Sequence, residues 1–90
     1  MPTIRIPTPM RPYVNGMQAV AVTGQNAAEA VESLLTQFPT LRPQLTNERG
    51  EMRSFVNLFL GENNIRDLQG LETPLGELDQ LLLIPSVAGG

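Results

Sequence analysis

The reactive groups that usually carry out catalysis are missing from this chain's side chains. The sequence contains no Cys and no His, and its six basic residues are all Arg, so Lys is absent as well. It therefore offers no thiolate nucleophile, no imidazole base and no side-chain amine that could form a Schiff base or accept an isopeptide bond. Scattered carboxylates such as Glu29, Glu72 and Asp79 are typical of a solvated surface. We predict no catalytic side chain and no metal site.

The main-chain carboxylate of Gly90 is the remaining candidate for chemistry. An ATP-dependent partner can convert it to an acyl adenylate, from which sulfur or an amine then displaces AMP. With sulfur the product is a C-terminal thiocarboxylate. The tail that we expect a partner to thread comprises Ser86, Val87, Ala88 and Gly89.

The length and composition of this tail suit such a role. Its five residues after Pro85 span about 17 Å when extended, at roughly 3.3 to 3.6 Å per residue. Gly89 and Gly90 lack a Cβ and pass through channels that exclude other residues. A terminal Gly-Gly is also compatible with an idle, frayed end.

Bulk properties describe one small acidic domain. The chain has 90 residues, 41% of them hydrophobic, and a formal net charge of -3. Dispersed arginines in an acidic chain argue against a nucleic-acid partner. No apolar run approaches the roughly 20 residues that span a bilayer, so we expect no membrane association. We expect a cytoplasmic protein that is monomeric when free.

The first forty residues predict a hairpin followed by a helix. Residues 3–8 and 17–23 alternate as half-buried strands do, and Asn15-Gly16 is a strong turn signal. Asn26 can cap a helix that ends before Pro39, and Glu29 completes the capping box. The apolar stripe of that helix consists of Ala27, Ala30, Val31, Leu34, Leu35 and Phe38.

The second half of the chain predicts three more strands. They are expected at residues 54–61, at Ile65 and Arg66, and at residues 80–84, and a single helical turn is expected within the loop 39–53. One helix packed on one face of a small mixed sheet is the economical arrangement, which makes the fold α+β. We expect a domain at 1–85 and a flexible tail at 86–90.

The open face of the sheet is a candidate interface. Alternation in the strand at 54–61 turns one apolar set toward the helix and leaves Phe55 and Phe59 on the other side. Two residues of the run 81–84 must join them. The predicted docking patch comprises Phe55, Phe59, Leu81 and Leu83. Alternatively, the face assignment is inverted, or the loop 39–53 covers the patch.

Three segments resemble a known family. These are IPTPMRP at 6–12, FVN at 55–57 and LIPSVAGG at 83–90. Together they are similar to the ubiquitin-like sulfur carriers of the ThiS and MoaD family, and most of all to its cysteine-biosynthesis branch. The resemblance implies a β-grasp fold and a protein cosubstrate that is not itself an enzyme.

The same resemblance implies the partners. An activating enzyme similar to the ubiquitin-activating class would use ATP to adenylate Gly90, and a rhodanese-type donor would supply sulfur; no cofactor would be bound to the carrier. A cysteine synthase-type acceptor would take the sulfur, and a metalloprotease would release the product. Alternatives are sulfur delivery to molybdopterin or thiamine synthesis, a ubiquitin-like modifier joined to amines of other proteins, and a non-covalent β-grasp binding module.

Overall fold

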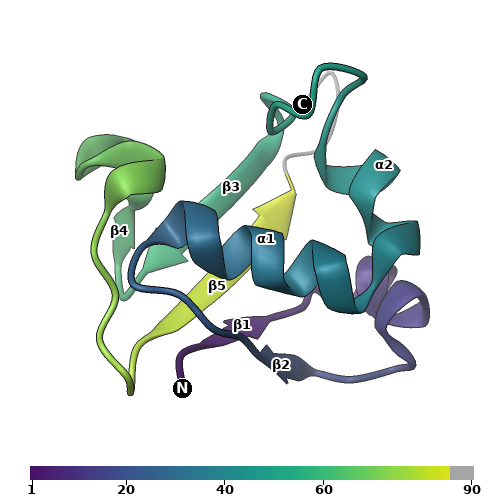
Figure 1. Ribbon diagram of the computed structural model, residues 1–90, viewed down its shortest axis with the longest axis horizontal. Coiled ribbons are helices and arrows are strands. Elements are labelled where there is room, and N and C mark those ends of the chain that lie inside the picture. The colour runs from purple at the N-terminus through teal and green to yellow at the C-terminus, as the bar shows by residue number, and fades with distance from the viewer. Residues whose placement is uncertain (86–90) are drawn as a thin grey trace.

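The computed structural model describes residues 1–85, which form a five-stranded mixed sheet with a main helix across one face (Figure 1). The strands are β1 (Thr3–Arg5), β2 (Ala19–Ala21), β3 (Val56–Leu60), β4 (Asn63–Asn64) and β5 (Gln80–Pro85). The helices are α1 (Ala27–Gln37) and α2 (Arg42–Leu45), with 3-10 helices η1 (Thr8–Val14), η2 (Pro39–Leu41), η3 (Ile65–Asp67) and η4 (Gly70–Glu72). The predictions for Ser86–Gly90 concern residues outside this range.

The sheet brings the first and last strands of the chain together at its centre. The strand order is β2-β1-β5-β3-β4. β1 pairs antiparallel with β2 and parallel with β5, where Ile4 lies opposite Leu81. β3 pairs antiparallel with β5, where Leu58 lies opposite Leu83. The predicted hairpin and the α+β class are therefore confirmed.

The connection within the hairpin contains structure that the sequence did not predict. Residues Thr8–Val14 form η1, which begins after Pro7 and buries Met10 and Val14. Asn15 and Gly16 follow in the left-handed region, with φ of 57° and 77°. The amide of Met17 donates to the Val14 carbonyl at 3.1 Å, which closes the turn. The Asn-Gly turn is thus confirmed, although it follows η1 instead of joining two strands directly.

Helix α1 forms as predicted. The Asn26 side chain accepts a hydrogen bond from the Glu29 amide at 2.9 Å, and the Glu29 carboxylate accepts one from the Gln25 amide at 2.8 Å. Both bonds satisfy main-chain donors at the start of the helix. Of the predicted stripe only Phe38 is not fully buried, and it packs against the core.

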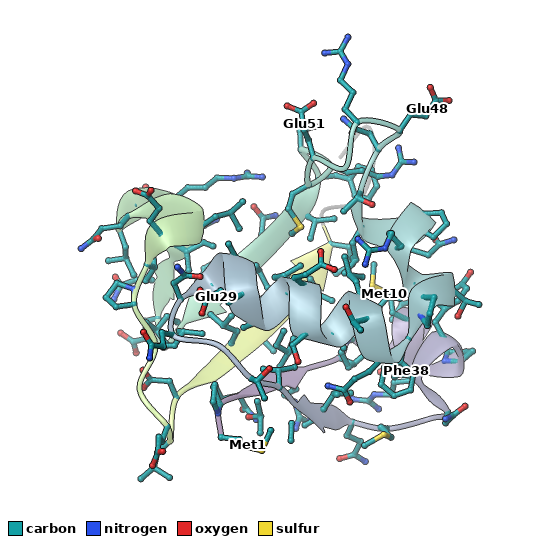
Figure 2. The ribbon with its side chains drawn as sticks, viewed as in Figure 1. Met1, Met10, Glu29, Phe38, Glu48 and Glu51 are labelled. Atoms are coloured by element: carbon teal, nitrogen blue, oxygen red, sulfur yellow. The ribbon has the colours of Figure 1, made fainter. Side chains whose placement is uncertain are left out.

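The core lies between α1 and the covered face of the sheet, and the segment between α1 and β3 closes it at one end. Leu41 and Leu45, in η2 and α2, are completely buried, which confirms the predicted helical turn in this segment. Glu48 and Glu51 project from the loop that follows α2 (Figure 2). This loop does not cover the open face of the sheet, because Phe55 and Ile84 on that side are 38% and 39% exposed.

The predicted strand at Ile65 and Arg66 is wrong. β4 comprises only Asn63–Asn64, and the chain then turns into η3. The Asn64 side chain causes the turn, because it accepts a hydrogen bond from the Arg66 amide at 3.0 Å and so caps η3. Ile65 is thereby directed into the core, where it is 5% exposed.

Candidate functional site

The tail begins at the end of the sheet's central strand. β5 lies between β1 and β3, and its last residue, Pro85, pairs with Val56. β5 is held on both sides as far as Leu82 and by β3 alone from there to Pro85, so the point at which the tail starts is anchored through β3. The candidate reactive group, on Gly90, and the threaded segment at 86–89 lie beyond the described residues and stay predictions.

Two of the four residues predicted for the docking patch are misplaced. Leu81 and Leu83 are 0% and 1% exposed and lie beneath α1, so they belong to the core. Their neighbours Leu82 and Ile84 occupy the open face instead. The reason is the register, because Leu81 pairs with the buried Ile4 and residues directly opposite share a face of the sheet.

The open face does carry an apolar cluster across β3 and β5. Leu82 pairs with Phe59, which lies on the open face as predicted but is half-buried, and Ile84 is 39% exposed. Phe55 precedes β3 and is 38% exposed, also as predicted. We call Phe55, Phe59, Leu82 and Ile84 the open-face patch. Arg5 lies beside Leu82 on β1 and provides a positive charge at its border.

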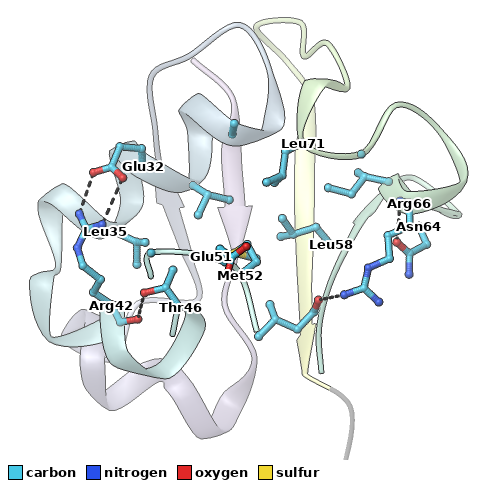
Figure 3. Close-up of a pocket in the computed structure, with 16 residues that line it drawn as sticks. Glu32, Leu35, Arg42, Thr46, Glu51, Met52, Leu58, Asn64, Arg66 and Leu71 are labelled. Atoms are coloured by element: carbon cyan, nitrogen blue, oxygen red, sulfur yellow. Dashed lines mark hydrogen bonds and ion pairs between the residues drawn. The ribbon is translucent and has the colours of Figure 1, made fainter. Parts of the chain in front are cut away.

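The opposite side of the molecule contains a groove that the sequence did not predict. It has a volume of about 620 Å³ and lies between α1 and β3 (Figure 3). Apolar side chains form its walls, among them Val31, Leu35, Met52 and Leu58. No sequence signal distinguished these residues from ordinary core positions, because a groove depends on the spacing between elements.

An ion pair closes one side of the groove. The Arg42 guanidinium donates to the Glu32 carboxylate at 2.8 and 3.3 Å and so joins α2 to α1 (Figure 3). The hydrogen bond from Arg42 holds the pKa of Glu32 below its usual value, against a smaller opposing effect of desolvation. The same bond raises the pKa of Arg42. Both side chains are largely exposed, so the pair contributes little stability.

Arg66 lies on the other side of the groove and forms a network with β3. Its guanidinium donates to the main-chain carbonyls of Ser54 and Val56 at 2.9 and 3.1 Å, and to the Asn57 side-chain oxygen at 3.1 Å. The Asn64 side-chain amide donates to the same Asn57 oxygen at 3.2 Å. The sequence gave Arg66 no such role, because its partners are 9 to 12 residues away in the chain.

Within residues 1–85, no group of three or more acidic residues lies close enough to hold a metal ion. No helix in this part of the chain has the length and apolar character needed to cross a membrane.

Known proteins resemble this chain over nearly its full length. The sulfur carrier protein CysO of Mycobacterium tuberculosis is 28% identical over 90 residues, which is 98% of this chain and 97% of CysO. A chain in the crystal structure of the BexX/CysO complex of Amycolatopsis orientalis is 27% identical, with a TM-score of 0.87 and full coverage of both chains. The small archaeal modifier protein 1 of Methanosarcina acetivorans is 26% identical with a TM-score of 0.85, and the match covers 99% of this chain and 95% of that one.

These structural matches confirm the β-grasp fold that the sequence resemblance implied. The model of the ThiS family matches residues 4–90. The match therefore includes both the sheet and the Gly-Gly terminus. With nearly every residue inside that match, the chain belongs to the ThiS family.

Proposed function

We propose that this protein is a sulfur carrier whose reactive group is the C-terminal carboxylate of Gly90. An activating enzyme transfers AMP from ATP to this carboxylate and releases pyrophosphate. A sulfide equivalent then attacks the acyl carbon, AMP leaves with one of the two carboxylate oxygens, and a thiocarboxylate remains on the protein. The carrier is thus a cosubstrate of other enzymes and binds no cofactor of its own, since ATP is used by its partner.

The observation that carries the proposal is the extent of the ThiS-family match, which runs from β1 to Gly90. Similarity to sulfur carrier protein CysO supports it, because the match covers 98% of this chain. The chemistry also requires nothing from the domain's side chains. A chain without Cys, His or Lys suits that requirement.

We propose that the sulfur is used to make cysteine, because the chain is similar to CysO. In this scheme a rhodanese-linked activating enzyme loads the carrier, and a cysteine synthase-type enzyme lets the thiocarboxylate sulfur displace the leaving group from the Cβ of an activated serine. The thioester that forms rearranges to an amide on the amino group of the new cysteine. A metalloprotease then hydrolyses this amide, which frees cysteine and restores the Gly90 carboxylate. Molybdopterin and thiamine synthesis are the alternative destinations within the same chemistry. Because activation consumes ATP, we place the protein in the cytoplasm.

The open-face patch is the surface that we propose for the activating enzyme. Phe59, Leu82 and Ile84 lie on β3 and β5, Phe55 directly precedes β3, and β5 ends at Pro85, where the tail begins. An enzyme bound to the open-face patch would therefore lie close to the point at which the tail begins. Phe59→Glu and Leu82→Glu should therefore raise the KM for adenylation, while Glu77→Gln in the loop before β5 should not. Equal KM values for all three variants would contradict this assignment.

Mass spectrometry tests the central proposal. Incubation of the intact protein with its activating enzyme, ATP and a sulfur donor should replace one oxygen by sulfur, and a protein that lacks Gly90 should stay unmodified. A deletion variant that is still converted, or an intact protein that never is, would refute the proposal. Urea unfolding of both forms provides the control, and equal free energies of unfolding would show that the deletion leaves the domain intact.

A second candidate, a protein modifier, is favoured by the likeness to small archaeal modifier protein 1. The adenylate of Gly90 would then be attacked by an amine of another protein. Because the chain has no Lys, it could not be extended through its own side chains and would act as a single tag. Conjugates of higher mass in cell extracts would support this function, whereas a thiocarboxylate without conjugates would support only the carrier function.

A further inference from the structure

The short length of β4 leaves part of the neighbouring strand without a partner. β4 pairs only with Phe59 and Leu60 of β3. The chain then turns away into η3, so the edge of β3 from Val56 to Leu58 has no strand beside it in the described part of the chain. Main-chain carbonyls on such an edge need donors from elsewhere.

Arg66 supplies a donor to this edge. Its Nη2 reaches the Val56 carbonyl at 3.1 Å, and it also reaches the carbonyl of Ser54, in the turn that precedes β3, at 2.9 Å. Its Nη1 donates to the Asn57 side chain. The base of Arg66 is itself fixed, because Asn64 caps η3 and the adjacent Ile65 is buried. The guanidinium therefore satisfies the Val56 carbonyl on the edge that β4 leaves open.

The residues that Arg66 holds are those against which the end of β5 is paired. β1 pairs with β5 only as far as Leu82. Beyond Leu82, the remaining strand partner of β5 is β3, through Asn57 opposite Ile84 and Val56 opposite Pro85. Pro85 has no amide hydrogen to donate. The last residues of β5 thus depend on the start of β3, which is held by Arg66 together with the hydrogen bond from the Val56 amide to the Arg53 carbonyl at 3.0 Å.

We infer that Arg66 is a positioning residue for loading of the tail, because its guanidinium holds the start of β3, against which the last residue before the tail, Pro85, is paired. This inference rests on the proposed function in one respect, namely that Gly90 must enter a partner's active site. A fixed starting point lowers the entropy lost when the tail is threaded. Its loss should weaken productive binding and leave the chemical step unchanged.

A lysine should not replace this residue. The guanidinium is a planar fork that donates to three acceptors at once, while an ammonium is a compact point charge on a flexible stem. Arg66→Lys keeps the charge and removes the fork, and Arg66→Gln removes both. Arg49→Gln, in the exposed loop after α2, is the control for the change in charge.

Hydrogen exchange tests the structural half of the inference. The main-chain groups of Asn57 alternate with those of Val56 and face β5, where Ile84 is the partner. In Arg66→Gln and Arg66→Lys we expect these two amides to exchange about tenfold faster, a change equivalent to about 1.4 kcal/mol. The amides of Phe59 and Leu82 should change little, since β1 also holds Leu82. Unchanged exchange at Asn57 and Ile84 would overturn the inference.

Adenylation kinetics test the functional half. The assay uses ATP–pyrophosphate exchange with the adenylating enzyme of the same organism. Both Arg66 variants should show a KM raised about fivefold with kcat unchanged, the pattern of lost uniform binding, and Arg49→Gln should match the parent. A lowered kcat at unchanged KM, or no change in either, would refute the positioning role.

The protein lacking Gly90 separates this inference from the proposed function. If that variant is inactive and the Arg66 variants are normal, the carrier function stands and the role of Arg66 is refuted. If the variant without Gly90 is still adenylated, the proposed function fails, whatever the exchange rates show. Should Arg66→Gln fail to fold, Arg66→Lys carries both measurements.

Discussion

Adjacent leucines on β5 should differ sharply in their contribution to stability. Leu83 is 1% exposed and lies between the sheet and α1, whereas Leu82 is half-buried on the open face. Truncation of a buried leucine to alanine removes its transfer free energy and leaves a cavity, which costs about 2 to 5 kcal/mol. A half-buried leucine leaves no closed cavity, so we expect about 1 kcal/mol or less for Leu82→Ala.

Urea unfolding followed by circular dichroism measures both values. A domain of this length has a free energy of unfolding of about 5 to 13 kcal/mol, so Leu83→Ala would remove a large part of it. The slope of the unfolding transition should stay the same in both variants, since a change of slope signals an altered denatured state. Equal losses for Leu82→Ala and Leu83→Ala, or a larger loss for Leu82→Ala, would refute the assignment of the two faces.

Three further predictions concern α1 and its surroundings. Asn26→Ala removes the cap of α1 and should cost about 1 kcal/mol, seen as a melting temperature lower by about 4 to 8 °C. Gly24→Ala should destabilise by about 1 to 3 kcal/mol in urea unfolding, because Gly24 has φ of 139° and an added Cβ would lie 2.6 Å from the Glu29 Cβ. Arg42→Gln should raise the pKa of Glu32 toward its usual 4.5, as measured by NMR titration. Because folding lowers that pKa, the pair's small contribution is present above pH 4.5 and is lost as the pH falls below it.

Local signals made much of the fold predictable. Asn26 and the helical stripe defined α1, and Asn15-Gly16 defined a turn, because capping and left-handed conformations depend on residues close in sequence. The 3-10 helix η1 was missed, since Pro9 and Pro12 indicate a break in a strand as readily as the start of a short helix.

The errors arose where distant contacts decide. All four residues of the run 81–84 are apolar, so their alternation carries no information on which two face the helix; pairing with Ile4 settles it. Arg66 was wrongly assigned to a strand. Its actual contacts are the carbonyls of Ser54 and Val56, which are too distant in the chain for a local pattern to reveal. An arginine soon after a very short strand is a signal that could have suggested an edge without a partner.

The parallel contact between β1 and β5 links the two ends of the domain, with Thr3 opposite Gln80. During synthesis β1 must wait for the last strand before the centre of the sheet can form, and such distant pairings make folding slow. A chain that ends before β5 would therefore leave β1 and β3 without the strand that lies between them, and the core would stay open.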